Sequence, residues 1–346
     1  SRPASGTNWQ PRSPRTPPAR ARDRYHRGVI ELHVRPGPAL SRADFLATHP
    51  AFSIALDGYV HGEPFLVVRE DGPFRNFNHH EAVDRSCTIA TCEQSRRAVL
   101  LGLYDLFRSG GKRRALLWVN DCDQDVCLST WILLNPDRAA EPLVRKLTQI
   151  EDLLDSSSGT FPLPHERDLM GEVRWVFDPY ARARPRLTGM SAADMRQVIG
   201  DVHLRIDQFV IGRAQQVPLD GNYVRLGGDD WWLVEVDRLQ ARERMIAAGC
   251  RAAVELSART GDRYVYSLWR RSEYITWFPV REILDALNAA EGISEDEPHR
   301  WGGADNVGGS PRGVGSRLTP VDVERVVDRV VEQALARAGN IERGRT

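Results

Sequence analysis

The sequence has no apolar run long enough to span a lipid bilayer, so we expect no membrane-spanning helix. Cysteine is scarce, and five residues in a chain of 346 do not suggest a disulfide framework. Net charge is absent because 47 basic side chains balance 47 acidic ones, so bulk electrostatics favour no polyanionic partner. The first residues are polar and contain no apolar signal segment, which leads us to expect a cytoplasmic protein. No internal repeat is visible.

The composition is typical of a globular protein, with 41% apolar and 27% charged residues. The length favours two domains. We expect a disordered tail, a first lobe, a helical connection and a second lobe, at 1–27, 28–160, 161–221 and 222–340. The tail is rich in proline, arginine and serine without periodicity, and solvation explains its arginines more simply than contact with nucleic acid.

Hydrophobic periodicity predicts an α/β fold of two lobes. In the first lobe, strands and helices alternate, as in a mostly parallel sheet flanked by helices. Its strands are predicted at 28–34, 52–57, 64–68 and 115–119, and its helices at 86–109 and 126–134. The second lobe is predicted to be a smaller α/β domain with a mixed sheet. Its strands are predicted at 231–236, 252–256, 264–269 and 274–278, and its helices at 280–290 and 320–338.

Two short segments of the first lobe are too polar to pack in an apolar core. Residues 78–81 are Asn-His-His-Glu, and residues 121–125 are Asp-Cys-Asp-Gln-Asp, directly after a predicted strand. A strand, an acidic loop and a helix in succession place side chains at the carboxyl end of a sheet. Imidazole and carboxylate together are ligands for a divalent cation such as Mn²⁺ or Mg²⁺. If the two segments converge, they form a metal site.

The aspartates have a simpler explanation, in which Asp125 caps the helix predicted from Val126. One cap needs one aspartate, so three favour a metal site. In an extended loop, Asp121 and Asp123 would face the same side, and Asp125 could join them. An EF-hand loop is excluded, because its sixth and twelfth positions would be Val126 and Ile132 instead of glycine and glutamate.

Other side chains of the first lobe can complete such a site. Asp57 ends the second predicted strand, while Asp152 and Asp155 lie on a predicted helix, where exposure is the simpler explanation. Neighbouring histidines in a loop are often simply exposed. Adjacent side chains diverge, however, so one of His79 and His80 can bind metal while the other orients a carboxylate or meets a phosphate.

Four of the cysteines form two equally spaced pairs, Cys87 with Cys92 and Cys122 with Cys127. Zinc-binding pairs lie in turns, whereas both pairs here run into predicted helices, where positions i and i+5 do not share a face. We therefore expect buried apolar cysteines. The aspartates around Cys122 would raise its pKa, which works against a nucleophilic thiolate.

A glycine-rich stretch at 302–315 is the strongest signal of the second lobe, and it leads into a helix near Pro320. Backbone amides of such a loop and a helix N-terminus can bind an anion, and Arg312 and Arg317 can pair with phosphate. Surface loops without a ligand are also rich in glycine, so this signal is weak by itself.

Together, these segments resemble the DHH phosphoesterase superfamily with its associated C-terminal substrate-binding domain. Residues 78–81 are similar to the Asp-His-His motif with Asn78 replacing the first acid, and residues 121–125 are similar to an Asp-x-Asp metal motif. Residues 308–316 resemble the Gly-Gly-His-x-x-Ala-Ala-Gly loop of the C-terminal domain, and 271–272 resemble its substrate-facing Arg-Ser. In the family, Asp-x-Asp usually precedes Asp-His-His, whereas the order is reversed here.

The resemblance implies a divalent-metal-dependent phosphoesterase that hydrolyses a phosphodiester or phosphoanhydride of a nucleotide-type substrate. The first lobe would hold Mn²⁺ or Mg²⁺ through Asp121, Asp123, His79, Asp57 and Asp155. His80 and His79 would be catalytic, stabilising phosphoryl oxygens or protonating the leaving oxygen. The second lobe would bind the substrate through Arg271, Gly308, Gly309, Ser310, Arg312 and Ser316. The expected partner is a small nucleotide or a short oligonucleotide, and no membrane is expected. A homodimer is compatible with these expectations.

Two alternatives stay open. A non-catalytic protein derived from a phosphoesterase fold would bind a nucleotide or RNA as a sensor, and Asn78 favours it because an uncharged residue weakens a metal site. In an unrelated fold, the histidine and aspartate segments would never meet.

Overall fold

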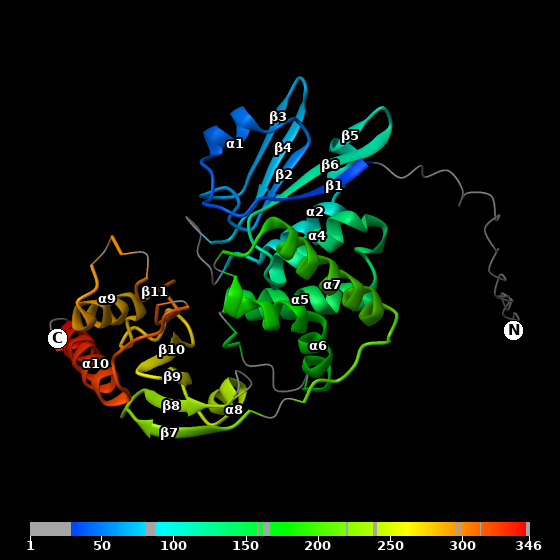
Figure 1. The fold of residues 1–346 in the computed structure, drawn as a ribbon. Coiled ribbons are helices and arrows are strands. Elements are labelled where there is room, and N and C mark those ends of the chain that lie inside the picture. Colours follow the sequence, from blue (N-terminus) through cyan, green and yellow to red (C-terminus); the bar gives the residue numbers. More distant parts are fainter. Residues whose placement is uncertain are drawn as a thin grey trace, which may run out of the picture.

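The computed structural model describes residues 29–80, 87–157, 159–161, 167–187, 189–218, 221–237, 241–294, 296–297, 299–311 and 313–343. The predicted tail, Glu81, Asp84 and Arg312 lie outside these residues. The described chain forms an α/β fold of two lobes, each built on a mixed sheet with helices packed against it (Figure 1). The predicted fold class is confirmed.

The first sheet brings the carboxyl ends of parallel strands to one edge. Its strands are β1 (Val29–Val34), β2 (Ser53–Leu56), β3 (Phe65–Arg69), β4 (Gly72–Phe77), β5 (Arg108–Ser109) and β6 (Lys112–Val119). Their order is β1-β6-β2-β4-β3, and β1, β6, β2 and β4 run parallel. β3 pairs antiparallel with β4, and the short β5 pairs antiparallel with the start of β6.

Central strand β2 is buried on both faces, which explains its apolar sequence. Phe45 of α1 (Arg42–Thr48) packs on one face with Phe74 and Trp118, while a layer of larger helices covers the other. No residue range was predicted for β4, because Gly-Pro at its start is typical of a turn. Pro73 lies near the beginning of the strand, where a missing N–H is tolerated.

The layer of larger helices forms one core with the first sheet (Figure 1). These helices are α2 (Thr91–Leu100), α4 (Gln124–Leu134), α5 (Pro142–Ser156), α6 (Arg167–Ala183) and α7 (Ala192–Val210), with 3-10 turns at Pro136–Arg138 and Arg184–Arg186. The segment 161–221, predicted as a connection between domains, thus contributes α6 and α7 to the first lobe. Pro179 inside α6 obscured the helical pattern, because proline usually interrupts a helix.

The helix predicted over 86–109 is shorter in the structure. α2 ends at Leu100, and Gly102 adopts a left-handed conformation with φ of 94°. The short α3 (Leu103–Leu106) and the hairpin of β5 and β6 follow. Glycine adopts positive φ without a Cβ clash, so Gly102 ends the helix before the predicted stop at Gly110.

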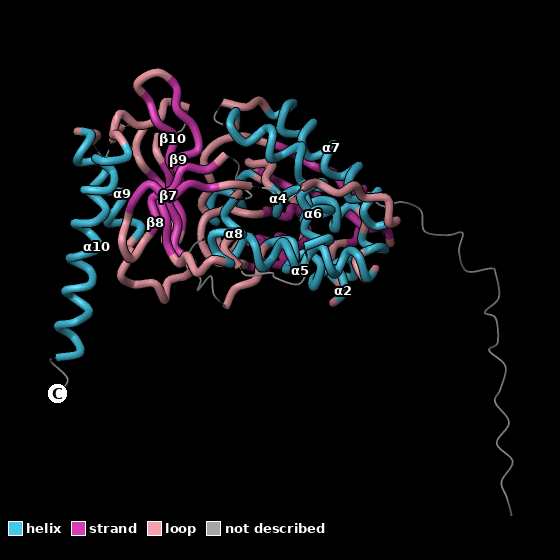
Figure 2. The backbone as a smooth tube through the Cα atoms, turned by 90° about the horizontal axis from the view of Figure 1, so that it is seen from below, coloured by secondary structure: helices cyan, strands magenta, loops and turns pink. Residues whose placement is uncertain are grey.

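The second lobe is a mixed sheet with helices on both faces (Figure 2). Its strands are β7 (Tyr223–Gly227), β8 (Trp232–Val236), β9 (Ala252–Thr260), β10 (Arg263–Arg270), β11 (Gly302–Gly303) and β12 (Val307–Gly309), and its helices are α8 (Ala241–Ala247), α9 (Val280–Glu291) and α10 (Pro320–Arg343). The strand order is β11-β12-β10-β9-β8-β7. α9 and α10 pack on one face and α8 on the other. None of the described helices, α10 included, is long and apolar enough to cross a membrane.

The strand predicted at 274–278 is wrong, because turns occupy this segment. Its aromatic residues Trp277 and Phe278 pack against the core beneath α9. Aromatic residues are enriched in strands because they fit half-buried surfaces, and here a turn presents them to the same kind of surface.

A buried contact joins the second lobe to the chain that leaves α5. Thr160 is buried, and its Oγ1 donates to the carbonyl oxygen of Arg271 at 3.0 Å. Arg174 of α6 forms an ion pair with Glu243 of α8. The C-terminal turn of α5, which carries Asp155, therefore lies next to the contact between the lobes.

Replacing Phe177 with alanine tests whether α6 belongs to the first core. Phe177 is 1% exposed. We expect Phe177→Ala to lower the free energy of unfolding by about 3–5 kcal/mol, as for other buried aromatic truncations. The matched control is Leu204→Ala on α7, because Leu204 is 65% exposed. Its cost should stay within about 0.5 kcal/mol in the same urea titration. Equal, small losses in both variants would contradict the placement of α6.

Candidate metal centre

Neighbouring parallel strands deliver polar segments to one edge of the first sheet. Asp57 follows β2, residues 78–80 follow β4, and residues 120–125 follow β6. β2 pairs with β4 on one side and with β6 on the other. The segments are therefore adjacent although they are distant in sequence. In open α/β sheets, this carboxyl edge is where ligands bind.

Asp57 has an unusual backbone conformation at this edge. Its φ is 47°, in the left-handed region, and Gly58 follows with φ of 76°. The Asp57 amide donates to the carbonyl oxygen of Phe77 at 2.9 Å. A positive φ is uncommon outside glycine, although aspartate tolerates it better than most residues. The resulting turn brings the Asp57 carboxylate into contact with the histidines that follow β4.

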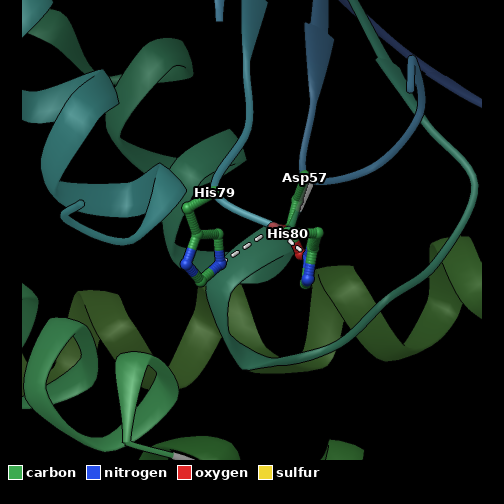
Figure 3. Close-up of side chains that lie close together, drawn as sticks. All are labelled: Asp57, His79 and His80. Atoms are coloured by element: carbon green, nitrogen blue, oxygen red, sulfur yellow. Dashed lines mark hydrogen bonds and ion pairs between the residues drawn. The ribbon is translucent and has the colours of Figure 1, made fainter. Parts of the chain in front are cut away.

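His79 and His80 both lie beside this carboxylate (Figure 3). His80 Nε2 is 2.8 Å from Asp57 Oδ1, and His79 Nε2 is 3.4 Å from the same oxygen. The Thr91 hydroxyl at the start of α2 donates to that oxygen at 3.1 Å. His79 is fully buried, whereas the His80 side chain is 37% exposed. Of the two histidines, His80 is therefore the one that a molecule from solvent can reach.

His79 also faces carboxylates from two helices. Its Nε2 is 2.8 Å from Asp155 Oδ2 of α5 and 3.5 Å from Asp125 Oδ2 of α4. Neither ring nitrogen of His79 has a hydrogen bond of acceptable geometry within the described part of the chain. Ligand atoms of Asp57, His79 and His80 lie within 4.8 Å of one another, as do those of His79, Asp125 and Asp155. A buried imidazole with converging carboxylate oxygens, but without hydrogen bonds, fits a divalent cation.

The N-terminus of α2 holds the carboxylates of α4 and α5 in place. Thr91 N donates to Asp125 Oδ2 at 2.7 Å, and Cys92 N donates to Asp125 Oδ1 at 2.6 Å. Ala90 N donates to Asp152 Oδ1 at 2.6 Å. Ala90 is the N-cap residue and has no capping side chain. Side chains of other helices therefore satisfy the amides that a helix leaves unpaired at its positive end.

Two of the aspartates after β6 accept hydrogen bonds from nearby backbone amides. Asp123 is the N-cap of α4, with Oδ1 accepting from Val126 N at 2.8 Å. Asp121 Oδ1 accepts from Cys122 N at 2.6 Å. The cap assigned to Asp125 thus belongs to Asp123, because α4 begins earlier than predicted. Among the described residues, Asp125 joins the candidate ligand groups, and Asp121 and Asp123 do not.

Burial and the nearby charges shift the pKa values of this cluster. Burial and the charge of Asp57 raise the pKa of Asp123 well above its usual value and that of Asp125 to about 7. Burial lowers the pKa of His79, but the Asp155 and Asp57 carboxylates outweigh it and raise that pKa to about 11. A bound divalent cation would supply the positive charge that this set of carboxylates lacks.

Sequence reasoning missed Thr91 and Glu151. Thr91 orients Asp57 through its hydroxyl. Glu151 is buried in α5 beside the cluster, and burial together with the nearby carboxylates raises its pKa well above the usual value. One signal for Glu151 was available, because it lies four residues after Leu147 and seven after Val144, on the apolar face of α5. No comparable signal marks Thr91.

Asn78, where the resemblance implies an aspartate, has a structural task. Its Nδ2 donates to the carbonyl oxygen of Gly62 at 2.7 Å and to that of Val60 at 3.4 Å. Its Oδ1 accepts from the amides of His79 at 2.9 Å and His80 at 3.2 Å. An aspartate could not donate to the two carbonyls. Asn78 therefore shapes the turn that carries both histidines. Its side chain points to backbone groups, so an uncharged residue at this position does not remove a metal ligand.

Three of the four paired cysteines are buried as expected, namely Cys92, Cys122 and Cys127. The expectation is wrong for Cys87, which is exposed. Burial and the charges of the neighbouring aspartates raise the pKa of Cys122 to about 12. A thiol in this environment stays protonated, so it is not an activated nucleophile.

The glycines predicted to approach a substrate instead allow strands to pack closely. Gly308 and Gly309 lie in β12, between β11 and β10. A Cβ on Gly309 would lie 2.8 Å from the carbonyl oxygen of Tyr266, and one on Gly308 would lie 2.8 Å from the Leu284 side chain. Both positions require glycine for packing alone.

The remaining residues predicted to bind substrate are also parts of the packed second lobe. Ser310 and Ser316 are buried. Ser310 Oγ accepts from a backbone amide of β10 at 3.0 Å, and Ser316 Oγ donates to Glu291 at 2.8 Å. Arg271 is half-buried at the lobe contact, where its carbonyl oxygen accepts from Thr160. Arg312 lies outside the described residues.

Comparison with known proteins adds no assignment: no family model matches this chain, and no curated protein matches it.

Replacing Asn78 with aspartate tests its structural role. We expect Asn78→Asp to lower the free energy of unfolding by about 2 kcal/mol or more, because an acceptor-only carboxylate would face two carbonyl oxygens in a buried position. The variant should not bind Mn²⁺ more tightly. Urea titration and isothermal titration calorimetry measure both quantities. Gln215→Glu, at an exposed position, controls for the added charge. Tighter Mn²⁺ binding by Asn78→Asp would contradict this role.

Metal binding at this site should strengthen as the pH rises. His79 and Asp125, with pKa values of about 11 and about 7, must release protons to bind a cation. When the pKa of a carboxyl group is higher in the folded state than in the unfolded state, the group stabilises the metal-free fold at a pH below its unfolded-state pKa. This stabilisation is lost as the pH rises through its folded-state pKa. The melting temperature of metal-free protein should therefore fall relative to Mn²⁺-saturated protein between about pH 5 and about pH 8.

Calorimetric melting of both forms at each pH measures this difference, because groups remote from the site contribute equally to both. A difference that stays constant or shrinks with pH would exclude these groups as metal ligands.

Proposed function

We propose that the protein is a divalent-metal-dependent phosphoesterase that hydrolyses a phosphodiester or phosphoanhydride of a nucleotide-type substrate. One observation carries this proposal. Asp57, His79, His80, Asp125 and Asp155 converge at the carboxyl edge of the first sheet, with their ligand atoms in two groups that share His79. An oxygen-rich metal site with imidazole at an accessible edge is suited to hydrolysis of phosphate esters.

Mn²⁺ or Mg²⁺ is the cofactor that we assign to this site. Carboxylate oxygens suit both ions, and the imidazole ligands favour Mn²⁺. His79, Asp57, Asp125 and Asp155 would hold it. When bound, such an ion polarises a phosphoryl oxygen and lowers the pKa of coordinated water. The contacts from the start of α2 keep Asp57 and Asp125 oriented toward the ion position.

His80 is the side chain that we assign to contact with the substrate. Its imidazole is oriented by Asp57 at 2.8 Å and is partly exposed. Burial lowers the His80 pKa, but the Asp57 carboxylate outweighs this effect and the pKa is raised. A histidine that carries a proton can stabilise phosphoryl oxygens or protonate the leaving oxygen.

The alternative is a non-catalytic protein that binds a nucleotide or RNA as a sensor. At the sequence level, Asn78 favoured it as a lost metal ligand. The contacts of Asn78 remove this reason, because its amide nitrogen faces backbone carbonyls. We therefore place the enzyme first. A sensor would bind its ligand without metal, and Asp57→Asn would leave that binding intact.

The relation to the DHH phosphoesterase superfamily is part of this proposal. The histidine pair and the acidic segment after β6 lie at one sheet edge, which fits the resemblance in spite of the reversed order of the motifs. A cytoplasmic location and a homodimer are further predictions.

Hydrolysis by metal-stripped protein, with Mn²⁺ or Mg²⁺ added back, tests the proposal. The substrates are bis(p-nitrophenyl) phosphate, di- to pentanucleotides, cyclic dinucleotides and pyrophosphate. We expect metal-dependent cleavage, and Asp57→Asn should lower kcat about 100-fold or more because both histidines contact this carboxylate. Asp105→Asn on α3, with a side chain that is 85% exposed, is the matched control.

Calorimetric titration with Mn²⁺ separates the outcomes. Joint loss of metal binding and turnover in Asp57→Asn supports the enzyme. Metal binding by wild-type protein without hydrolysis of any substrate favours the sensor. Absence of metal binding in wild-type protein would exclude the site itself.

A further inference from the structure

A pocket of about 370 Å³ opens at the same edge of the first sheet. Its walls come from the loop after β1, the loop after β6 and the chain around the start of α7, and they include Pro36, Gly37, Asn120, Asp121, Met190 and Met195. Pockets for small organic ligands commonly measure about 300–1,000 Å³. The pocket is therefore large enough for part of a nucleotide.

Backbone contacts place this pocket next to the metal centre. Asn120 Nδ2 donates to the carbonyl oxygens of Gly37 at 3.4 Å and Gly58 at 3.5 Å. A Cβ on Gly58 would lie 3.4 Å from His80 Cδ2. Gly58 thus adjoins both the Asn120 side chain and His80. A substrate that contacts His80 can extend over Gly58 into the pocket.

The lining of the pocket combines apolar and polar side chains. Met190, Met195 and Pro36 provide apolar surface, and methionine packs well against aromatic rings. Asn120 and Asp121 provide hydrogen-bonding groups. A second phosphate is disfavoured, because the Asp121 carboxylate would repel it. The complementary ligand is uncharged, flat on one side, and carries hydroxyl or amino donors.

We propose that this pocket binds the nucleoside end of the substrate while the scissile phosphate lies at the metal centre, an inference that rests on the proposed phosphoesterase function. Asp121, expected from the sequence as a metal ligand, is then a specificity residue that accepts a hydrogen bond from a sugar hydroxyl or a base amino group. The pocket favours diesters that carry a nucleoside over pyrophosphate, which has no group to fill it.

Two variants and two esters test this proposal. Met190→Trp fills the pocket, and Asp121→Asn removes its carboxylate with little change in size. The p-nitrophenyl ester of thymidine 5′-monophosphate carries a nucleoside, and bis(p-nitrophenyl) phosphate has the same leaving group without one. In each variant, the ratio of kcat/KM for the first ester to that for the second should fall about tenfold or more, as for loss of a hydrogen bond to a charged group.

Exposed positions supply the matched controls. Leu204→Trp adds the same ring on α7, and Asp105→Asn removes the same charge on α3. Both should keep the wild-type ratio. Mn²⁺ affinity, measured by calorimetry, should be the same in Asp121→Asn as in wild-type protein. Loss of that affinity, or an unchanged ratio in both pocket variants, would overturn the proposal.

Binding of thymidine to metal-free protein gives a readout that needs no turnover. Saturation-transfer NMR should detect thymidine on wild-type protein and on Leu204→Trp, and the signal should be lost in Met190→Trp. If wild-type protein cleaves neither ester, the proposed function fails, and this binding experiment alone tests whether the pocket binds a nucleoside. Thymidine binding that Met190→Trp abolishes would then support the pocket, and absence of binding to wild-type protein would overturn it.

Discussion

The site depends on one interaction, the capping of α2 by carboxylates from other helices. Asp125 of α4 and Asp152 of α5 accept hydrogen bonds from backbone amides at the start of α2. These bonds fix three helices against one another at the carboxyl edge of the sheet. They also keep acidic side chains close together although their charges repel, because the positive end of a helix offsets part of that repulsion.

The direction of the Asp125 pKa shift distinguishes this carboxyl group from a buried ion pair, and the second lobe supplies the comparison. Glu255 is also buried, but Arg242 pairs with both of its oxygens, and Ser267 and Trp269 donate further hydrogen bonds. Burial raises the Glu255 pKa, but these partners outweigh it and the pKa is lowered. In the first lobe the pKa of Asp125 is raised instead. Asp125 accepts from backbone amides and faces further carboxylates, so a bound metal ion would stabilise its ionised form.

The structure also changes where a substrate is expected to lie. The glycine-rich segment of the second lobe is a paired strand, and its serines are bonded within the fold. The pocket beside Asn120 belongs to the first lobe and adjoins His80 through Gly58. The second lobe meets this region at the end of α5, where Thr160 contacts Arg271. The candidate metal centre and the pocket thus share one sheet edge.

Local sequence patterns are enough to predict the α/β class and to place the candidate metal centre at the carboxyl edge, because apolar periodicity and the succession of strand, acidic loop and helix are short-range features. The sequence also singled out Asp57, His79, His80 and Asp155. It could not assign α6 to the first core, since that depends on packing between distant segments. The position of Asp125 among the candidate ligands follows from the fold, because it depends on where α4 begins and on contacts with segments distant in sequence.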